Sequence, residues 1–144
     1  ALADAKARRP SDLKRSIVHY PLESHTAAFP AALAFECAVR FSRVVRAHEA
    51  LFEAQRASRL LAGTAEDVAR ASGVDDVDAY DRCLADTATH ARVYAGIELG
   101  RELQVRGTPT AIVGGWIIEP SAPETVLAAI EDLLAGSAPK LARR

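Results

Sequence analysis

The stretch RGTPTAIVGG, residues Arg106 to Gly115, places a proline at the entrance of a short β-branched run. Proline has no backbone N–H, so within sheets it is confined to strand starts, edges and bulges. The run TAIV is followed by Gly114-Gly115 and then by WIIE, which is the pattern of two short strands joined by a tight turn. We therefore expect an antiparallel hairpin over residues 108–119, with Pro109 at its entrance.

The rest of the chain combines a short β-prone run with longer helical patterns. SIVHY, Ser16 to Tyr20, is closed by a proline and is expected to form a short buried strand. From about residue 26 to residue 107 the sequence is Ala-rich, with apolar residues at spacings of three and four, which predicts helices. After the hairpin, Ser121 and Glu124 have the spacing of a capping box and begin an amphipathic helix.

Smaller features predict how the ends and the helices are arranged. Residues 1–8 have helix-forming composition, and residues 138–144 are expected to be a frayed tail. Gly96 and Gly100 lie four apart on one predicted helix, where they would allow a neighbour to approach closely. The histidines are expected at the surface or at an interface. Arg40, Arg43 and Arg46 are spaced three apart, which predicts a solvated stripe on one helix.

The composition fits one globular domain and excludes some partners. The chain has 144 residues, of which 49% are hydrophobic, enough for a single domain with a buried core. Because 18 basic residues oppose 19 acidic residues, the net charge is -1 and no global field attracts nucleic acid or an anionic membrane surface. No apolar run approaches the ~18 residues of a membrane-spanning helix, so no transmembrane segment is expected in this chain.

The order of these features is similar to that of a known family. The segments HYPLESH, AALAFECA and HEALF, followed by GTPTAIVGG, resemble the DsbA-like thiol-disulfide oxidoreductases, and the resemblance covers nearly the whole chain. It implies an α/β thioredoxin fold with a large all-helical insertion between the strand at 16–20 and the cis-Pro hairpin at 108–119. The implied thioredoxin core comprises residues 1–22 and 107–137, the insertion residues 23–106, and the tail residues 138–144.

In this family the loop proline is cis and faces a redox-active cysteine pair. The resemblance implies that Pro109 is cis and that Thr108 offers its backbone to an extended substrate. The local sequence alone is typical of an ordinary trans-proline that opens an edge strand. The chemistry needs a Cys-x-x-Cys at a helix N-terminus, where the thiol pKa is lowered. The given chain holds no such pair and hence no catalytic residue; the resemblance implies that the pair and a central strand precede Ala1.

Cys37 and Cys83 are the cysteines of the chain and can form one bridge at most. From the residues alone three interpretations stay open: a structural disulfide, separate free thiols, or a catalytic or resolving pair. The resemblance adds that cysteines at comparable places form a second, non-catalytic pair in relatives. Neither cysteine has zinc-ligand spacing to a histidine, so we expect no metal, and we expect no cofactor.

These observations lead to three functional hypotheses. The first is a DsbA-like thiol-disulfide oxidoreductase domain, whose partners are protein or peptide thiols and disulfides and a redox partner. The second is a redox-inactive thioredoxin-fold module that binds an extended peptide at the Pro109 edge. The third is a relative of the kappa-type glutathione transferases and isomerases, which share the fold. The resemblance implies a periplasmic or otherwise extracytoplasmic location, with the cytoplasm as the alternative.

Overall fold

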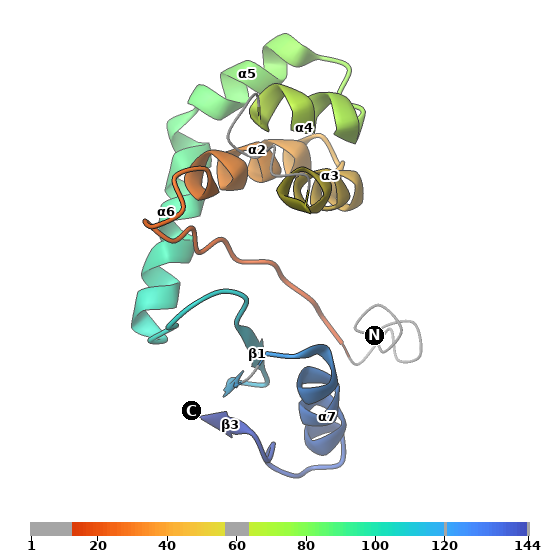
Figure 1. The fold of residues 1–144 in the computed structure, drawn as a ribbon, viewed down its shortest axis with the longest axis vertical. Coiled ribbons are helices and arrows are strands. Elements are labelled where there is room, and N and C mark those ends of the chain that lie inside the picture. Colours follow the sequence, from red (N-terminus) through yellow and green to blue (C-terminus); the bar gives the residue numbers. More distant parts are fainter. Residues whose placement is uncertain (1–12, 57–63, 120, 144) are drawn as a thin grey trace. The chain divides into compact units, whose positions relative to one another are not determined.

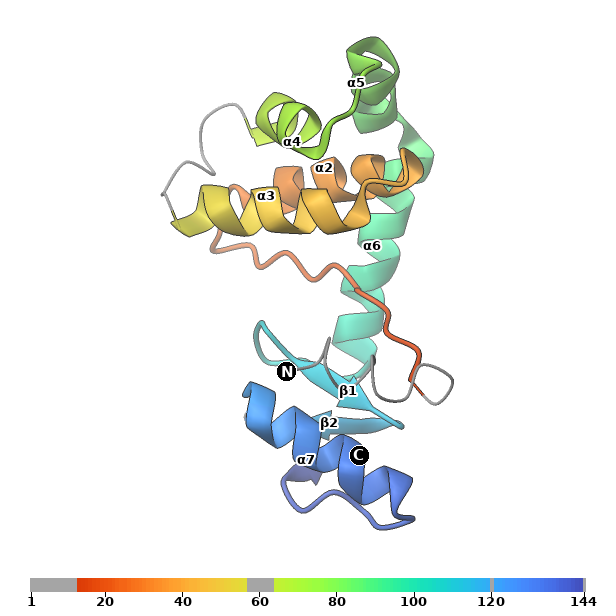
Figure 2. The same ribbon diagram turned by 90° about the vertical axis from the view of Figure 1, so that its right-hand side faces the viewer.

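The chain forms a unit made of helices and a second unit in which one helix packs against a small antiparallel sheet (Figures 1 and 2). The structure, a computed structural model, describes residues 13–56, 64–119 and 121–143. The chain divides into a helical unit, Val18–Gln104, and a sheet unit, made of Ala1–Ile17 and Val105–Arg144. The helix expected within residues 1–8 lies outside the described residues.

The helical unit is arranged around its first helix. It contains α2 (Ala28–Arg40), α3 (Val44–Arg56), α4 (Thr64–Ser72), α5 (Val77–Ala85) and α6 (Thr87–Glu102). α2 contacts each of the others because its residues are apolar and small. Its buried residues are Ala32, Leu33, Ala34, Phe35, Cys37 and Ala38. The helices expected between residues 26 and 107 are therefore present.

Aspartates begin the last two helices of this unit. The Asp76 carboxylate accepts a hydrogen bond from the Ala79 N–H at 2.8 Å and begins α5. The Asp86 carboxylate accepts one from the Ala88 N–H at 2.9 Å and begins α6. These bonds satisfy backbone donors that have no partner within the helix. Because Asp86 also ends α5, one residue fixes the turn between the two helices.

The segment Val18–Tyr20 lies along α6. A Cβ atom at Gly96 would collide with the carbonyl oxygen of His19, and a Cβ atom at Gly100 would collide with the Tyr20 ring. The close approach predicted from the spacing of these glycines is confirmed.

The strand predicted at residues 16–20 is wrong. A strand needs a neighbour for its backbone N–H and C=O groups, and no described segment pairs with these residues. Residues 18–20 pack against a helix instead, and the β-branched side chains of Ile17 and Val18 remain exposed. The adjacent β-branched residues Ile17 and Val18 indicate a β-prone run, but pairing decides whether such a run becomes a strand.

The sheet unit contains a hairpin, a helix and a third strand. β1 (Ala111–Val113) pairs antiparallel with β2 (Trp116–Ile118), and β2 pairs antiparallel with β3 (Ala142–Arg143). Gly114 and Gly115 have φ values of 57° and 82°, the positive values that a tight hairpin turn requires. α7 (Pro123–Leu134) packs against the hairpin. The core of the unit is formed by Ile118, Val126, Ala129 and Ile130.

The prediction of a frayed tail over residues 138–144 is wrong for the end that the structure describes, residues 142 and 143. Ala142 pairs with Ile118 and Arg143 pairs with Ile117, so the end of the chain extends the sheet. The Arg143 guanidinium also lies 3.1 Å from the Glu119 carboxylate. A strand of two residues is too short to show alternation in the sequence. Its position is set by the free side of β2.

The predicted capping box before α7 is also wrong. The residue that precedes α7 is Ala122, which has no side chain to cap the helix. The Ser121 hydroxyl instead donates to the Ile118 carbonyl at 2.7 Å and accepts from the Ala111 N–H at 2.9 Å. Ser121 therefore joins β1 to β2.

Candidate functional site

Thr108 and Pro109 lie at the entrance of β1, and both are exposed. The peptide bond between them is cis. The Thr110 hydroxyl donates to the Gly107 carbonyl at 2.6 Å and holds the loop in shape. Because Pro109 has no N–H, no backbone donor needs a partner at that position. The loop therefore presents the Thr108 backbone beside the start of a strand.

β1 has one open edge within the part of the chain that the structure describes. β2 pairs with one side of β1, and no described strand lies on the other side. Val113 and Trp116 flank the tight turn and form a hydrogen-bonded pair, so the N–H and C=O of Ile112 point away from β2. An extended segment can add to this edge through main-chain hydrogen bonds.

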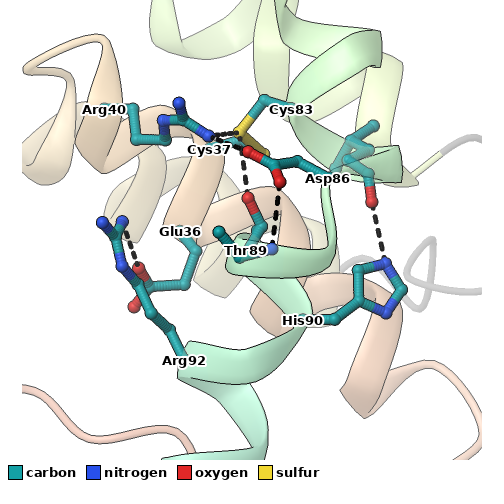
Figure 3. A network of polar contacts seen from close by, with 10 residues as sticks. Glu36, Cys37, Arg40, Cys83, Asp86, Thr89, His90 and Arg92 are labelled. Atoms are coloured by element: carbon teal, nitrogen blue, oxygen red, sulfur yellow. Dashed lines mark hydrogen bonds and ion pairs between the residues drawn. A yellow bond between two sulfur atoms is a disulfide. The ribbon is translucent and has the colours of Figure 1, made fainter.

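A disulfide joins Cys37 in α2 to Cys83 in α5, with 5.8 Å between their Cα atoms (Figure 3). Of the interpretations that the sequence leaves open, the structure contains the bridged form. A second tie lies close by, where the Tyr80 hydroxyl donates to the Ala34 carbonyl at 2.8 Å. Burial raises the pKa of Tyr80, so this donor stays protonated. The bridge and the hydrogen bond both hold α5 against α2.

Arg40 connects the bridge to the turn between α5 and α6 (Figure 3). Its Nη1 lies 3.7 Å from the Cys83 sulfur and 2.8 Å from Asp86 Oδ2. The Thr89 hydroxyl lies 3.5 Å from the same sulfur. The pKa of Asp86 lies below its usual range, mainly because the carboxylate accepts the Ala88 N–H and secondly because it accepts a hydrogen bond from Arg40. The ion pair of Arg40 with the Asp86 carboxylate therefore lies beside the Cys83 end of the bridge.

His19 and Glu36 form a second polar contact in the helical unit. The His19 Nε2 lies 3.0 Å from Glu36 Oε1, and their side chains are 13% and 17% exposed. The Arg92 guanidinium approaches the other carboxylate oxygen at 3.8 Å. Burial lowers the pKa of His19, although the charge and hydrogen bonding of Glu36 act in the opposite direction. His19 thus attaches the segment 18–20 to α2 mainly in its neutral form.

The sequence prediction missed the roles of Arg40 and His19. The arginine spacing predicts a solvated stripe, yet Arg40 contacts both Cys83 and Asp86. One signal is local, since Arg40 follows Cys37 by one helical turn. Nothing in the sequence links Arg40 to Asp86, because 46 positions separate them.

The predicted site residues fall in different units. Thr108 and Pro109 belong to the sheet unit, whereas Cys37 and Cys83 belong to the helical unit. Within residues 13–56, 64–119 and 121–143, none of the helices has the length and apolar character needed to span a bilayer.

The chain combines mixed helices with a small three-stranded sheet. The chain belongs to the thioredoxin family: the family model described as thioredoxin matches residues 7–132. Comparisons with curated proteins and with solved structures found no match.

Proposed function

We propose that this chain is part of a DsbA-like thiol-disulfide oxidoreductase, which exchanges disulfides with protein thiols through a Cys-x-x-Cys pair upstream of Ala1. Membership of the thioredoxin family supports the class of chemistry. The observation that carries the proposal is the exposed Thr108–Pro109 loop, in which the Thr108 backbone lies beside the start of β1. Such a loop offers main-chain hydrogen bonds to an extended polypeptide of almost any sequence.

The proposal assigns a role to each part of the chain. Residues 1–22 and 107–137 belong to the thioredoxin core, and residues 23–106 form a helical insertion. The position of α2 to α6, between residues 28 and 102, supports this division. The open edge of β1 at Ile112 receives the central strand of the core, since an exposed strand edge is otherwise prone to aggregation. The Thr108 backbone then stays available to form main-chain hydrogen bonds with the substrate.

The exchange proceeds through a mixed disulfide. A substrate thiolate attacks one sulfur of the active-site disulfide, and the electron pair of the broken S–S bond passes to the other cysteine. A second substrate thiolate then attacks the substrate sulfur of the mixed disulfide and releases the remaining active-site thiolate. The substrate leaves with a disulfide, and the Cys-x-x-Cys pair is left reduced. Thr108 holds the extended substrate in place between these steps.

The same proposal places the protein in an oxidising compartment, periplasmic or otherwise outside the cytoplasm. Disulfides persist in such compartments and are rare where glutathione and thioredoxin keep thiols reduced. The buried bridge between Cys37 and Cys83 supports this location.

Substitution of Pro109 tests the proposal in the natural full-length protein. The oxidation rate of a reduced, unfolded protein substrate is measured by acid quenching and mass spectrometry. Pro109→Ala adds a backbone N–H and frees φ, which leaves the Thr108 backbone less fixed. We expect about a tenfold slower exchange, equivalent to ~1.4 kcal/mol. Pro123→Ala, in the first turn of α7, is the matched control and should keep the wild-type rate. Equal rates for Pro109→Ala and wild type would overturn the role of the loop.

A second candidate is a redox-inactive module that binds an extended peptide at the same loop. The observation in its favour is that both cysteines of the sequence form a buried bridge. This candidate predicts peptide binding that Pro109→Ala weakens, with no transfer of a disulfide to the substrate.

A further inference from the structure

The two sulfurs of the Cys37–Cys83 bridge have different surroundings (Figure 3). Cys37 is completely buried in the apolar core of the helical unit, among residues such as Ala34 and Ala38. Cys83 retains 5% exposure, and its sulfur lies near the guanidinium of Arg40 and the hydroxyl of Thr89. One end of the bridge is thus apolar and closed, and the other is polar.

The polar end lies next to solvent-accessible charges. The side chains of Arg40 and Asp86 are 45% and 35% exposed, so the ion pair near the Cys83 sulfur is accessible to water. Asp86 cannot move freely, because its carboxylate also accepts the hydrogen bond from the Ala88 N–H. Arg40 is therefore held within 3.7 Å of the sulfur by a residue that the helix start fixes in place.

A cation beside a sulfur favours the thiolate, and apolar burial favours the neutral thiol. Arg40 and the Thr89 hydroxyl therefore stabilise the Cys83 thiolate that full reduction of the bridge releases. Cys83 is also the cysteine that keeps some exposure, 5% against none for Cys37, so it is the sulfur that an incoming thiolate can reach. Nothing comparable contacts Cys37 among the described residues. The Asp86 carboxylate acts against a thiolate, but its charge is paired with the Arg40 guanidinium at 2.8 Å.

We propose that the Cys37–Cys83 bridge is a second thiol-exchange site, at which low-molecular-weight thiols react with Cys83. The thiolate of the small thiol attacks the Cys83 sulfur, and the S–S bond of the bridge breaks. Its electron pair passes to Cys37, which takes up a proton because the core disfavours a charge. The thiolate of a second small thiol then attacks the sulfur of the first small thiol in the mixed disulfide and releases the Cys83 thiolate beside Arg40. The bridge gains two electrons, and the small thiols leave as one disulfide.

Substitutions at Arg40 test the role of the charge beside the Cys83 sulfur. Arg40→Gln keeps most of the length and the hydrogen bonding of the side chain but removes the charge that attracts the incoming thiolate. Arg101→Gln, at an exposed ion pair with Glu98, changes the net charge equally and serves as the control.

The experiment treats the folded full-length protein with 2-mercaptoethanol, quenches it with an alkylating agent and maps the products by mass spectrometry. We expect the mercaptoethanol adduct on Cys83 and the alkylated thiol on Cys37. Opening of the bridge should be at least threefold slower in Arg40→Gln, whereas Arg101→Gln should match wild type. Arg40→Lys, which retains a cation, should recover part of the lost rate and so separates charge from misfolding.

The proposal is overturned if the adduct forms on Cys37, if Arg40→Gln and Arg101→Gln open at the same rate, or if the bridge opens only in urea. Because the readout is the Cys83 peptide, the result does not depend on an upstream cysteine pair or on the Pro109 loop. Failure of this proposal therefore leaves the proposed oxidoreductase function intact, and the reverse also holds.

Discussion

The Tyr20 ring lies against Gly100, the position of α6 where a side chain would collide with the ring. One turn earlier, the His19 backbone lies equally close to Gly96. These two glycines are therefore required by packing, although glycine weakens the interior of a helix. The contact attaches the segment 18–20 to the helical unit, together with the His19–Glu36 pair.

Alanine at these glycines should destabilise the protein. In an exposed helix, glycine to alanine stabilises by ~0.5–1 kcal/mol. Here Gly100→Ala should cost about 1–3 kcal/mol, because the new methyl group enters the space of the Tyr20 ring. Gly96→Ala should cost more, since its methyl group meets the His19 backbone, which cannot change rotamer. Urea unfolding measures both variants. Gly107→Ala, which meets nothing within 4 Å, is the control and should differ little from wild type.

Removal of the bridge should lower the stability of the helical unit. The bridge joins cysteines at a sequence separation of 46, so it closes a long loop and restricts the unfolded chain. The double variant Cys37→Ala/Cys83→Ala should lose about 2–4 kcal/mol in the free energy of unfolding. Reduction of the wild-type protein before urea unfolding should shift its midpoint in the same direction, while the double variant should not respond to reductant. An unchanged midpoint in the double variant would contradict a stabilising role.

His19 should make stability depend on pH. Burial lowers its pKa below the ordinary value of 6.5, so the unfolded chain binds the proton at a higher pH than the folded chain does. The stability contributed by neutral His19 is therefore complete above about pH 6.5 and is lost as the pH falls through the folded pKa. His19→Gln should flatten this decline, whereas His25→Gln, at an exposed position, should not. An NMR titration of His19 with a midpoint above 6.5 would contradict the argument.

Ser121 should stabilise the hairpin and not the helix that follows it. Ser121→Ala removes the hydroxyl that joins the Ala111 N–H to the Ile118 carbonyl, and should cost about 1–2 kcal/mol. Hydrogen exchange should become faster at Ala111, with little change at the start of α7. The exposed Ser137, replaced by alanine, provides the comparison. Faster exchange confined to α7 would instead support a capping role.

Local chemistry made the hairpin and the helices predictable. Gly114 and Gly115 are the residues that a tight turn with positive φ needs, and the β-branched residues on both sides leave one register. Asp76 and Asp86 likewise begin helices through bonds to residues two or three positions away. Features of this kind depend only on neighbouring residues.

Features that depend on distant partners could not be predicted in the same way. Residues 16–20 have β-prone side chains, but no described segment pairs with them. Residues 142 and 143 form a strand only because one side of β2 is free to pair. The contact of Arg40 with Asp86 requires α2 to meet the turn between α5 and α6, and the spacing of arginines along α2 carries no information about that meeting.

The intact mass of the natural protein, measured before and after reduction and alkylation, tests the proposed oxidoreductase function most directly. Peptide mapping identifies the alkylated residues and the residues that precede Ala1. The account predicts a Cys-x-x-Cys pair upstream of Ala1 that is alkylated after reduction, in addition to Cys37 and Cys83. A natural chain in which Cys37 and Cys83 are the only alkylated cysteines would contradict thiol exchange at the Thr108–Pro109 loop and leave that loop as a peptide-binding edge.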